Sequence, residues 1–251
     1  MMEPAQIHSE ISTAPEAVDG FMVTATDGVK LRVGVWQTTK ECLGTVLFFP
    51  GRGDYIELYG HPVAAFVDAG YNAVVIDWRG HGLSDRIAPN PKMGHVNSFS
   101  EYQLDVQALM TCVDELQLPR PLYLVGHSMG ACIALRSLMD GLAIEAAAFS
   151  APMFGIYMAP YERIAAWPLT WGLQAIGKGQ MYAPGFNDKS YVFRHDFDDN
   201  TLTNSKPEYD RWIMQGTKCP DLHTGGPSMG WLYAALKECA ALDKLPSPDI
   251  P

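Results

Sequence analysis

Strand-like and helix-like segments alternate along the first part of the chain, and this alternation constrains the fold more than any other feature. Apolar runs of strand length occur at residues 45–50, 71–77, 121–125 and 143–150. Segments with helical spacing lie between them, at residues 57–69, 98–116 and 129–140. Continuous apolar runs are typical of strands buried on both faces of a parallel sheet, and parallel strands need crossover helices. The pattern therefore predicts an α/β fold with a mostly parallel sheet flanked by helices.

The alternation stops after Ser150, and this break divides the chain. The segment that follows is rich in aromatic residues, prolines and methionines but shows no strand–helix alternation, so it is expected to be an insertion or lid. A helical pattern returns at 229–242. The expected divisions are a loose leader at 1–20, a core at 21–153, a lid at 154–228, and a return helix with the start of further core at 229–251.

Composition excludes several classes of function. The 251-residue chain has a formal net charge of −10, and an acidic chain is a poor partner for nucleic acid. Its five cysteines form no CxxC pair, and we find no metal cluster, phosphate loop or dinucleotide fingerprint, so neither a metal nor a cofactor is expected. The first twenty residues lack the basic and apolar regions of a secretory signal, and no apolar run reaches about 18 residues. These features predict a cytoplasmic protein.

The motif Gly-x-Ser-x-Gly at 126–130 carries the strongest chemical signal. It directly follows the apolar strand that ends at Val125 and directly precedes a helical segment, as a nucleophile elbow requires. Ser128 would then sit in a strained turn at the carboxyl edge of the sheet, where open α/β folds bind ligands. We expect Ser128 to be a nucleophile.

A second Gly-x-Ser-x-Gly motif at 226–230 serves as an internal control. It follows Asp-Leu-His-Thr-Gly, which is not a strand, and its Ser228 precedes the helical pattern at 229–242. Serine is a preferred residue at helix N-termini. Ser228 is therefore predicted to cap that helix.

Acyl transfer at Ser128 also requires two backbone N–H donors for the oxyanion. One comes from the residue after the nucleophile, here Met129, and the other from the loop after an earlier strand. That loop runs over residues 49–55 and contains Gly51-Arg52-Gly53. The amide of Arg52 is the expected second donor.

Five segments in this order resemble the α/β-hydrolase superfamily and, more narrowly, its bacterial lysophospholipase and monoacylglycerol-lipase-like branch. They are PGRGDYIELYG (50–60), IDWRGHGLSD (76–85), LVGHSMG (124–130), SAPM (150–153) and GGPSMGWL (225–232). The resemblance covers about 21–250 and implies an α/β-hydrolase fold, a serine nucleophile at Ser128, and oxyanion donors at Arg52 and Met129. One departure is Pro50-Gly51, where relatives often have His-Gly.

The triad order of this fold places an acid and then a histidine after the return helix. The chain ends at Pro251, where the acid-bearing strand is expected to begin, so we expect both residues beyond Pro251, with the last strands and helix of the fold. On this expectation the 251-residue chain hydrolyses esters slowly, and its strand at 143–150 has an open edge. The alternative bases His81, His95 and His223 are expected to be polar loop or pocket-wall residues.

The aromatic and methionine content of the lid suits an acyl chain. We therefore expect a serine ester hydrolase that acts on a lysophospholipid or a monoacylglycerol, and we leave a transient contact with a membrane surface and the oligomeric state open. A substrate pocket is expected to include His81, Met153, Phe154 and Trp231. Two alternatives remain: a peptidase or amide hydrolase whose acidic residues Asp196, Asp198 and Asp199 anchor an amine, and a catalytically impaired member that binds an apolar ligand.

Overall fold

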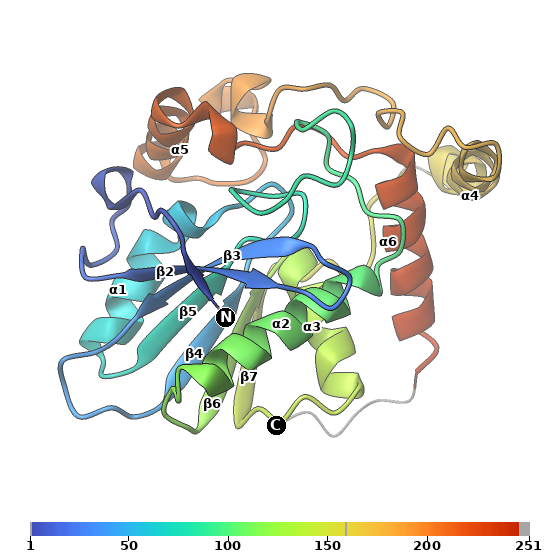
Figure 1. Ribbon diagram of the computed structural model, residues 1–251. Helices are drawn as coiled ribbons and strands as arrows, with labels where there is room; N and C mark the ends of the chain where they lie inside the picture. Colours follow the sequence, from blue (N-terminus) through green and yellow to red (C-terminus); the bar gives the residue numbers. More distant parts are fainter. Residues whose placement is uncertain (1, 159, 246–251) are drawn as a thin grey trace.

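A computed structural model of the chain describes residues 2–158 and 160–245, with residues 160–163 described by their backbone alone. Strands of this region form one sheet in the order β1-β2-β3-β5-β4-β6-β7 (Figure 1). The pairs from β1 to β5 are antiparallel, and the pairs among β5, β4, β6 and β7 are parallel. The strands are β1 (Glu3–Pro4), β2 (Asp19–Thr24), β3 (Lys30–Trp36), β4 (Thr45–Phe49), β5 (Asn72–Ile76), β6 (Leu122–His127) and β7 (Ala146–Ser150).

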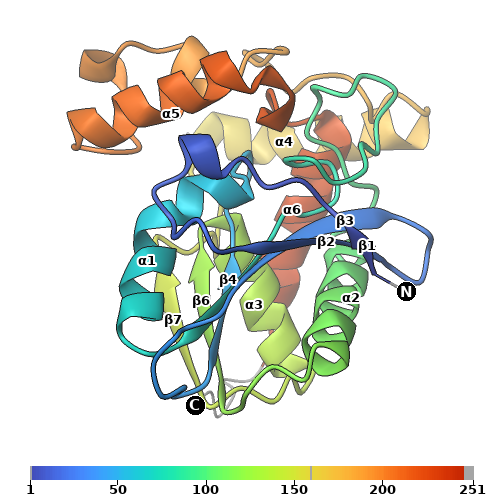
Figure 2. The same ribbon diagram turned by 60° about the vertical axis from the view of Figure 1, so that its left-hand side comes forward.

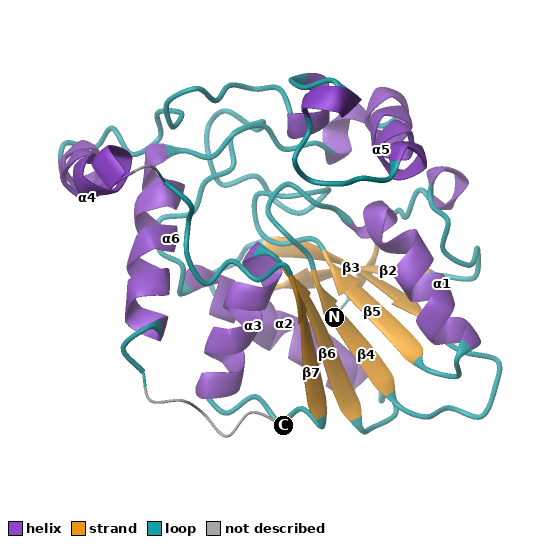
Figure 3. Ribbon diagram, turned by 180° about the vertical axis from the view of Figure 1, so that it is seen from behind, coloured by secondary structure: helices purple, strands orange, loops and turns teal. Residues whose placement is uncertain are grey.

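Helices cover both faces of this sheet. Helix α1 lies on one face, and α2, α3 and α6 lie on the other (Figures 2 and 3). The helices are α1 (Gly60–Asp68), α2 (Glu101–Glu115), α3 (Met129–Met139), α4 (Pro160–Ala175), α5 (Lys206–Lys218) and α6 (Met229–Leu242). Short 3-10 turns are η1 (Ser9–Ile11), η2 (Ile56–Tyr59), η3 (Tyr191–Phe193), η4 (Phe197–Asp199) and η5 (Pro220–Leu222). The predicted α/β architecture is confirmed.

Alternate residues of the central strands supply two apolar layers. In β4, Val46 and Phe48 pack with Val63 of α1, whereas Leu47 and Phe49 join the larger cluster beneath α2, α3 and α6. All of these strand residues are buried, because successive side chains of a strand point to opposite faces. The continuous apolar runs in the sequence follow from this two-sided burial.

The amino-terminal segment is more ordered than the sequence predicts. The hairpin of β2 and β3 is as expected, but β1 adds a further antiparallel strand within the predicted loose leader. Ile11 is buried, and the His8 amide donates a hydrogen bond of 3.0 Å to the Glu57 carboxylate. The leader prediction was wrong in this respect, because strand pairing, the buried Ile11 and several hydrogen bonds hold this segment against the core.

Residues 154–228, called the insertion below, join β7 to α6 and contain α4 and α5. The insertion lies above the carboxyl ends of the parallel strands, with α4 against α6 and α5 above the loop that follows β4 (Figure 1). Several of its large apolar side chains are exposed, among them Tyr157, Ile164, Leu169, Trp171 and Ile176. Among the described residues, no helix combines the length and the apolar character that crossing a bilayer requires.

Candidate active site

Ser128 occupies the turn between β6 and α3 with φ 50° and ψ −116°. This left-handed φ is unfavourable for a residue with a side chain, and such strain is typical of functional positions. Two glycines make the turn possible. A Cβ at Gly126 would lie 2.8 Å from Cα of Ala131, and a Cβ at Gly130 would lie 2.0 Å from the carbonyl oxygen of Phe49. The Gly-x-Ser-x-Gly motif is therefore a nucleophile elbow in geometry.

The neighbouring strand holds the elbow in place. The Ser128 amide donates to the carbonyl of Ser150 at the end of β7, at 3.0 Å, and the Met153 amide donates to the carbonyl of Ser128, also at 3.0 Å. Between these contacts, Ala151 has φ 44°. Backbone hydrogen bonds thus join the segments that follow β6 and β7, and they fix the direction of the Ser128 side chain.

The loop after β4, which the sequence predicts to hold an oxyanion donor, lies beside Ser128. A Cβ at Gly51 would lie 3.3 Å from Cβ of Ser128. The Gly51 amide donates to Oδ2 of Asp54 at 2.9 Å and to the hydroxyl of Tyr59 at 3.2 Å, and that hydroxyl donates to the same carboxylate oxygen at 2.9 Å. Asp54 therefore organises the loop.

Two backbone amides remain available at this site. Within residues 2–158 and 160–245, neither the Arg52 amide nor the Met129 amide donates a hydrogen bond to another group. An unsatisfied N–H beside a nucleophile is what an oxyanion requires. They are the amides of the two residues that the sequence predicts as oxyanion donors.

The side chain of Arg52 ties the loop to the insertion. Its Nη1 donates to the carbonyl of Gly225 at 3.1 Å, and the guanidinium lies 5.6 Å from the ring centroid of Trp231. Desolvation lowers the pKa of Arg52. Because one residue supplies both the candidate donor and this anchor, the position of the amide depends on the insertion.

A pocket of about 690 Å³ opens at Ser128 and is bounded by the loop after β4, the start of α1 and the insertion. Its apolar wall consists of Phe48, Leu58, Tyr59, Pro62, Val125, Ala151, Leu202 and Trp212. Its polar wall consists of Gly51, Arg52, Asp54, His127, Ser150, Thr201, Thr203, Glu208 and Arg211. A cavity of this size is typical of a small-molecule site.

The four residues expected to form the substrate pocket are placed elsewhere. His81 is buried, its Nδ1 lies 3.0 Å from the Arg79 carbonyl, and burial lowers its pKa to about 3. Phe154 is 43% exposed and packs edge-to-face on Phe149. Met153 packs against the main core, and Trp231 is buried within it. Among the described residues, the lining of the pocket at Ser128 contains none of the four.

Ser228 caps α6, as predicted. Its Oγ accepts the Trp231 amide at 3.0 Å. The same hydroxyl lies 2.7 Å from Nδ1 of His95, whose Nε2 lies 3.2 Å from Oδ1 of Asn97. This row resembles a nucleophile with a base and an orienting amide, but Ser228 is fully buried and does not line the pocket. The contact therefore has a structural role.

No described histidine forms a hydrogen bond with the Ser128 hydroxyl. His81 and His95 have the partners given above, and both ring nitrogens of His223 are buried without a partner. His223 packs against Tyr55, with ring centroids 5.5 Å apart, and burial lowers its pKa to about 4. We therefore assign no general base.

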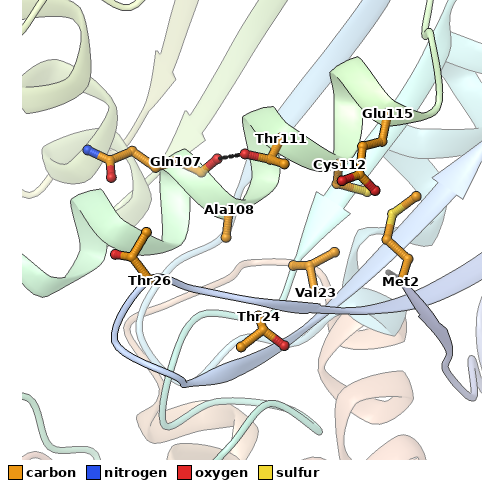
Figure 4. A pocket seen from close by; sticks show the side chains of 9 residues that line it. All are labelled: Met2, Val23, Thr24, Thr26, Gln107, Ala108, Thr111, Cys112 and Glu115. Carbon is orange, nitrogen blue, oxygen red and sulfur yellow. Dashed lines mark hydrogen bonds between the residues drawn. The ribbon is translucent and has the colours of Figure 1, made fainter.

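Two further groups of polar and thiol side chains lie outside the pocket at Ser128. A cavity of about 180 Å³ lies between β2 and α2 and is lined by residues such as Thr24, Thr111 and Cys112 (Figure 4). Burial raises the pKa of Cys112 to about 12, so its thiol is a poor nucleophile. His8, Glu10 and Cys219 place potential metal-binding atoms within 4.8 Å of one another, but burial raises the pKa of the Cys219 thiol and disfavours the thiolate that a metal needs. The polar pocket residues that sequence analysis missed include Glu208 and Arg211, since nothing in the sequence of α5 indicates that this helix borders the pocket at Ser128.

Comparison with known proteins places this geometry among the α/β-hydrolases. Lysophospholipase L2 of Escherichia coli (strain K12) is 30% identical over 200 residues, which cover 76% of this chain and 56% of that protein. The chain thus spans little more than half the length of this relative.

Solved structures share the fold. A thermostable carboxyl esterase from Bacillus coagulans superimposes with a TM-score of 0.66 at 18% identity, covering 90% of this chain and 73% of that chain. A monoglyceride lipase variant from Saccharomyces cerevisiae gives a TM-score of 0.60 at 21% identity, covering 87% and 67%. The Hydrolase_4 family, described as serine aminopeptidase, S33, matches residues 40–246. The resemblance to the lysophospholipase and monoacylglycerol-lipase-like branch is confirmed, and the chain belongs to this α/β-hydrolase family.

Proposed function

We propose that this chain supplies the nucleophile Ser128 and the oxyanion donors Arg52 and Met129 of a serine ester hydrolase that acts on single-chain acyl esters such as lysophospholipids or monoacylglycerols. The observation that carries the proposal is the strained Ser128 beside two unsatisfied amides, at the floor of a pocket of about 690 Å³. Lysophospholipase L2 and a monoglyceride lipase among the similar proteins support this substrate class.

The proposed reaction follows the serine hydrolase scheme. Oγ of Ser128 attacks the ester carbonyl carbon while a histidine base accepts its proton, and the amides of Arg52 and Met129 stabilise the oxyanion. The ester C–O bond then breaks, and the alcohol leaves with the proton from the histidine. Water, deprotonated by the same base, releases the fatty acid and restores Ser128. The base must reach hydrogen-bond distance of Oγ, and we assign it to no described residue.

We further propose that the insertion acts as a lid over the bound acyl chain. Its residues Leu202 and Trp212 already form part of the apolar wall of the pocket. Other apolar side chains, Trp171 and Ile176 among them, face solvent, which suits a transient contact with lipid surfaces. An adaptable apolar cover favours medium or long acyl chains over acetate.

The peptidase alternative makes a different demand on the pocket. It requires an acidic group that anchors a free amine, and Asp196, Asp198 and Asp199 do not line the pocket at Ser128. Asp198 and Asp199 are exposed on the turn η4. Glu208 is a pocket carboxylate that is paired with Arg211, and the peptidase alternative would have to rely on it. The ester hydrolase is therefore favoured.

Covalent labelling and substrate comparison test the proposal. A fluorophosphonate probe should label the protein and its Ser228→Ala variant but not Ser128→Ala, and Ser128 should be required for fatty acid release from a lysophospholipid. Decanoate esters of p-nitrophenol should be hydrolysed faster than acetate. Labelling that persists in Ser128→Ala and disappears in Ser228→Ala would overturn the assignment, and preferential cleavage of aminoacyl arylamides would support the peptidase.

A further inference from the structure

An ion pair on α5 forms part of the wall of the pocket at Ser128. Arg211 donates from Nη1 to Oε1 of Glu208 at 3.1 Å, and its Nη2 donates to Oε2 of the same carboxylate. His61, at the start of α1, approaches both, with Nδ1 2.8 Å from Nη1 of Arg211 and 3.1 Å from Oε1 of Glu208. Both Glu208 and Arg211 line the pocket that contains the nucleophile.

Two adjacent residues of this wall carry hydrogen-bond donors without acceptors. Nε of Arg211 and Nε1 of Trp212 are buried, and neither has a partner among the described residues. Buried donors are rarely left unpaired, because each loses its bonds to water. Because these two atoms are closed off from the pocket, the groups of this wall that a ligand can reach belong to the Arg211–Glu208 pair, whose side chains are 14% and 38% exposed.

The charges of this wall exclude the acyl chain as that ligand. A hydrocarbon chain against the Arg211–Glu208 pair would remove water from two charges and return no hydrogen bond, which is costly. The apolar side of the pocket, with Leu58, Pro62 and Leu202, offers the chain a better surface. The ion pair therefore faces the polar end of a substrate.

We propose that Arg211 and Glu208 form a head-group subsite for a zwitterionic phosphodiester, and hence that the substrate class is a lysophospholipid with an ammonium-bearing head group rather than a monoacylglycerol. This inference rests on the proposed function. The Arg211 guanidinium binds the phosphodiester oxygens in its planar fork, a geometry to which arginine is well matched. The Glu208 carboxylate then pairs with the ammonium group, so each charge of the wall exchanges one partner for another and none is left alone.

Binding of uncleavable ether lipids tests the subsite without requiring turnover. The ligands are 1-O-decylglycero-3-phosphocholine and 1-O-decylglycerol, which share the alkyl chain and lack the ester, and affinities are measured by titration calorimetry. The protein should bind the phosphocholine ether more tightly. Arg211→Gln should weaken that binding by about tenfold to a hundredfold, as expected for loss of a charge-assisted contact, while binding of decylglycerol changes less than about twofold.

Two further variants separate the roles of the charges. Lys206→Gln removes one member of the exposed Lys206–Asp210 pair on the same helix and should change neither affinity. Glu208→Gln should weaken binding of the phosphocholine ether but strengthen binding of decyl phosphate, because an anion then meets no carboxylate. Arg211→Lys keeps the charge without the fork and should retain part of the preference, which distinguishes a binding role from failure to fold.

Specific outcomes overturn the subsite. Equal affinities of the unmodified protein for the two ethers, or an Arg211→Gln variant that weakens both ligands alike, would do so. If Ser128-dependent ester hydrolysis is found alongside equal affinities, this inference fails and the proposed function stands. If the phosphocholine preference is found but Ser128 neither reacts with the probe nor supports hydrolysis, the proposed function fails and the subsite stands.

Discussion

Replacing Gly130 with alanine tests how closely α3 must approach β4 to form the elbow. A Cβ at this position would lie 2.0 Å from the carbonyl oxygen of Phe49 and 2.5 Å from that of Pro50. Both neighbours are backbone atoms at the start of the oxyanion loop, so no side-chain rotation relieves the overlap. The start of α3 and the end of β4 must move apart instead.

The size of this movement sets the expected effect. Ordinary van der Waals contact begins near 3.4 Å, so the overlap with the Phe49 carbonyl requires a separation of about 1.4 Å. Overpacking of this kind destabilises proteins by about 1–3 kcal/mol. The same movement separates the Met129 and Arg52 amides, and a misplacement of about 1 Å can slow catalysis about a hundredfold. We therefore expect both a lower free energy of unfolding and a much slower reaction at Ser128.

A second helical glycine provides the matched control. Gly172 lies in α4, and a Cβ there would meet no atom within 4 Å. Helix propensity alone predicts that alanine stabilises either helix by up to about 1 kcal/mol. Urea unfolding and the rate of fluorophosphonate labelling should show a neutral or stabilised Gly172→Ala and an impaired Gly130→Ala. If Gly130→Ala unfolds and reacts like the unmodified chain, the close approach of α3 to β4 is not what builds this elbow.

Three further outcomes are expected. Burial lowers the pKa of His223 to about 4, so the unfolded chain binds more protons than the folded chain between about pH 4 and 6.5, and stability falls as the pH drops through that range. His223→Phe should reduce the slope of unfolding free energy against pH by up to about 1.36 kcal/mol per unit, and an unchanged slope in urea titrations at pH 5 and 7 contradicts this. Glu57→Gln should destabilise the fold by about 3 kcal/mol, because the buried Arg32 loses a bidentate partner at 2.8 Å; thermal unfolding that matches the unmodified chain would refute it. Arg52→Ala should slow labelling of Ser128 about tenfold although the amide remains, since the loop loses its bond to the insertion; an unchanged rate would show that the side chain does not position the amide.

Local patterns in the sequence predicted much of the core and part of the site. The two-sided burial of β4 and β5 is visible as continuous apolar runs, and the elbow at Ser128 follows from a strand, two glycines and a helix that are contiguous in the chain. Ser228 could be assigned as a cap for the same reason, because an N-cap contacts residues only two or three positions ahead.

The polar wall of the pocket could not be predicted in this way. Arg211 is separated from Ser128 by more than eighty residues, and the insertion between them has no regular alternation that fixes where α5 lies. The pairing of Ser228 with His95 spans 133 positions and is equally invisible in the sequence. The expected pocket residues Phe154 and Trp231 lie in or next to recognisable sequence motifs. The observed wall of the pocket depends instead on how the insertion folds back over the sheet.

The two Gly-x-Ser-x-Gly motifs show why the same five-residue pattern has two physical outcomes. Ser228 has an extended backbone, with φ −78° and ψ 163°, and its Oγ is occupied by the Trp231 amide and His95. Ser128 has φ 50°, its Oγ has no partner among the described residues, and it opens into the pocket beside unsatisfied amides. The hydroxyl of Ser228 is already engaged by two hydrogen-bond partners in the buried core. One of these partners is a histidine, but the hydroxyl faces no pocket in which a substrate could bind. We therefore expect Ser128 and not Ser228 to react as the nucleophile, because only Ser128 combines a strained turn with an open pocket, and the backbone on either side of each motif determines this difference.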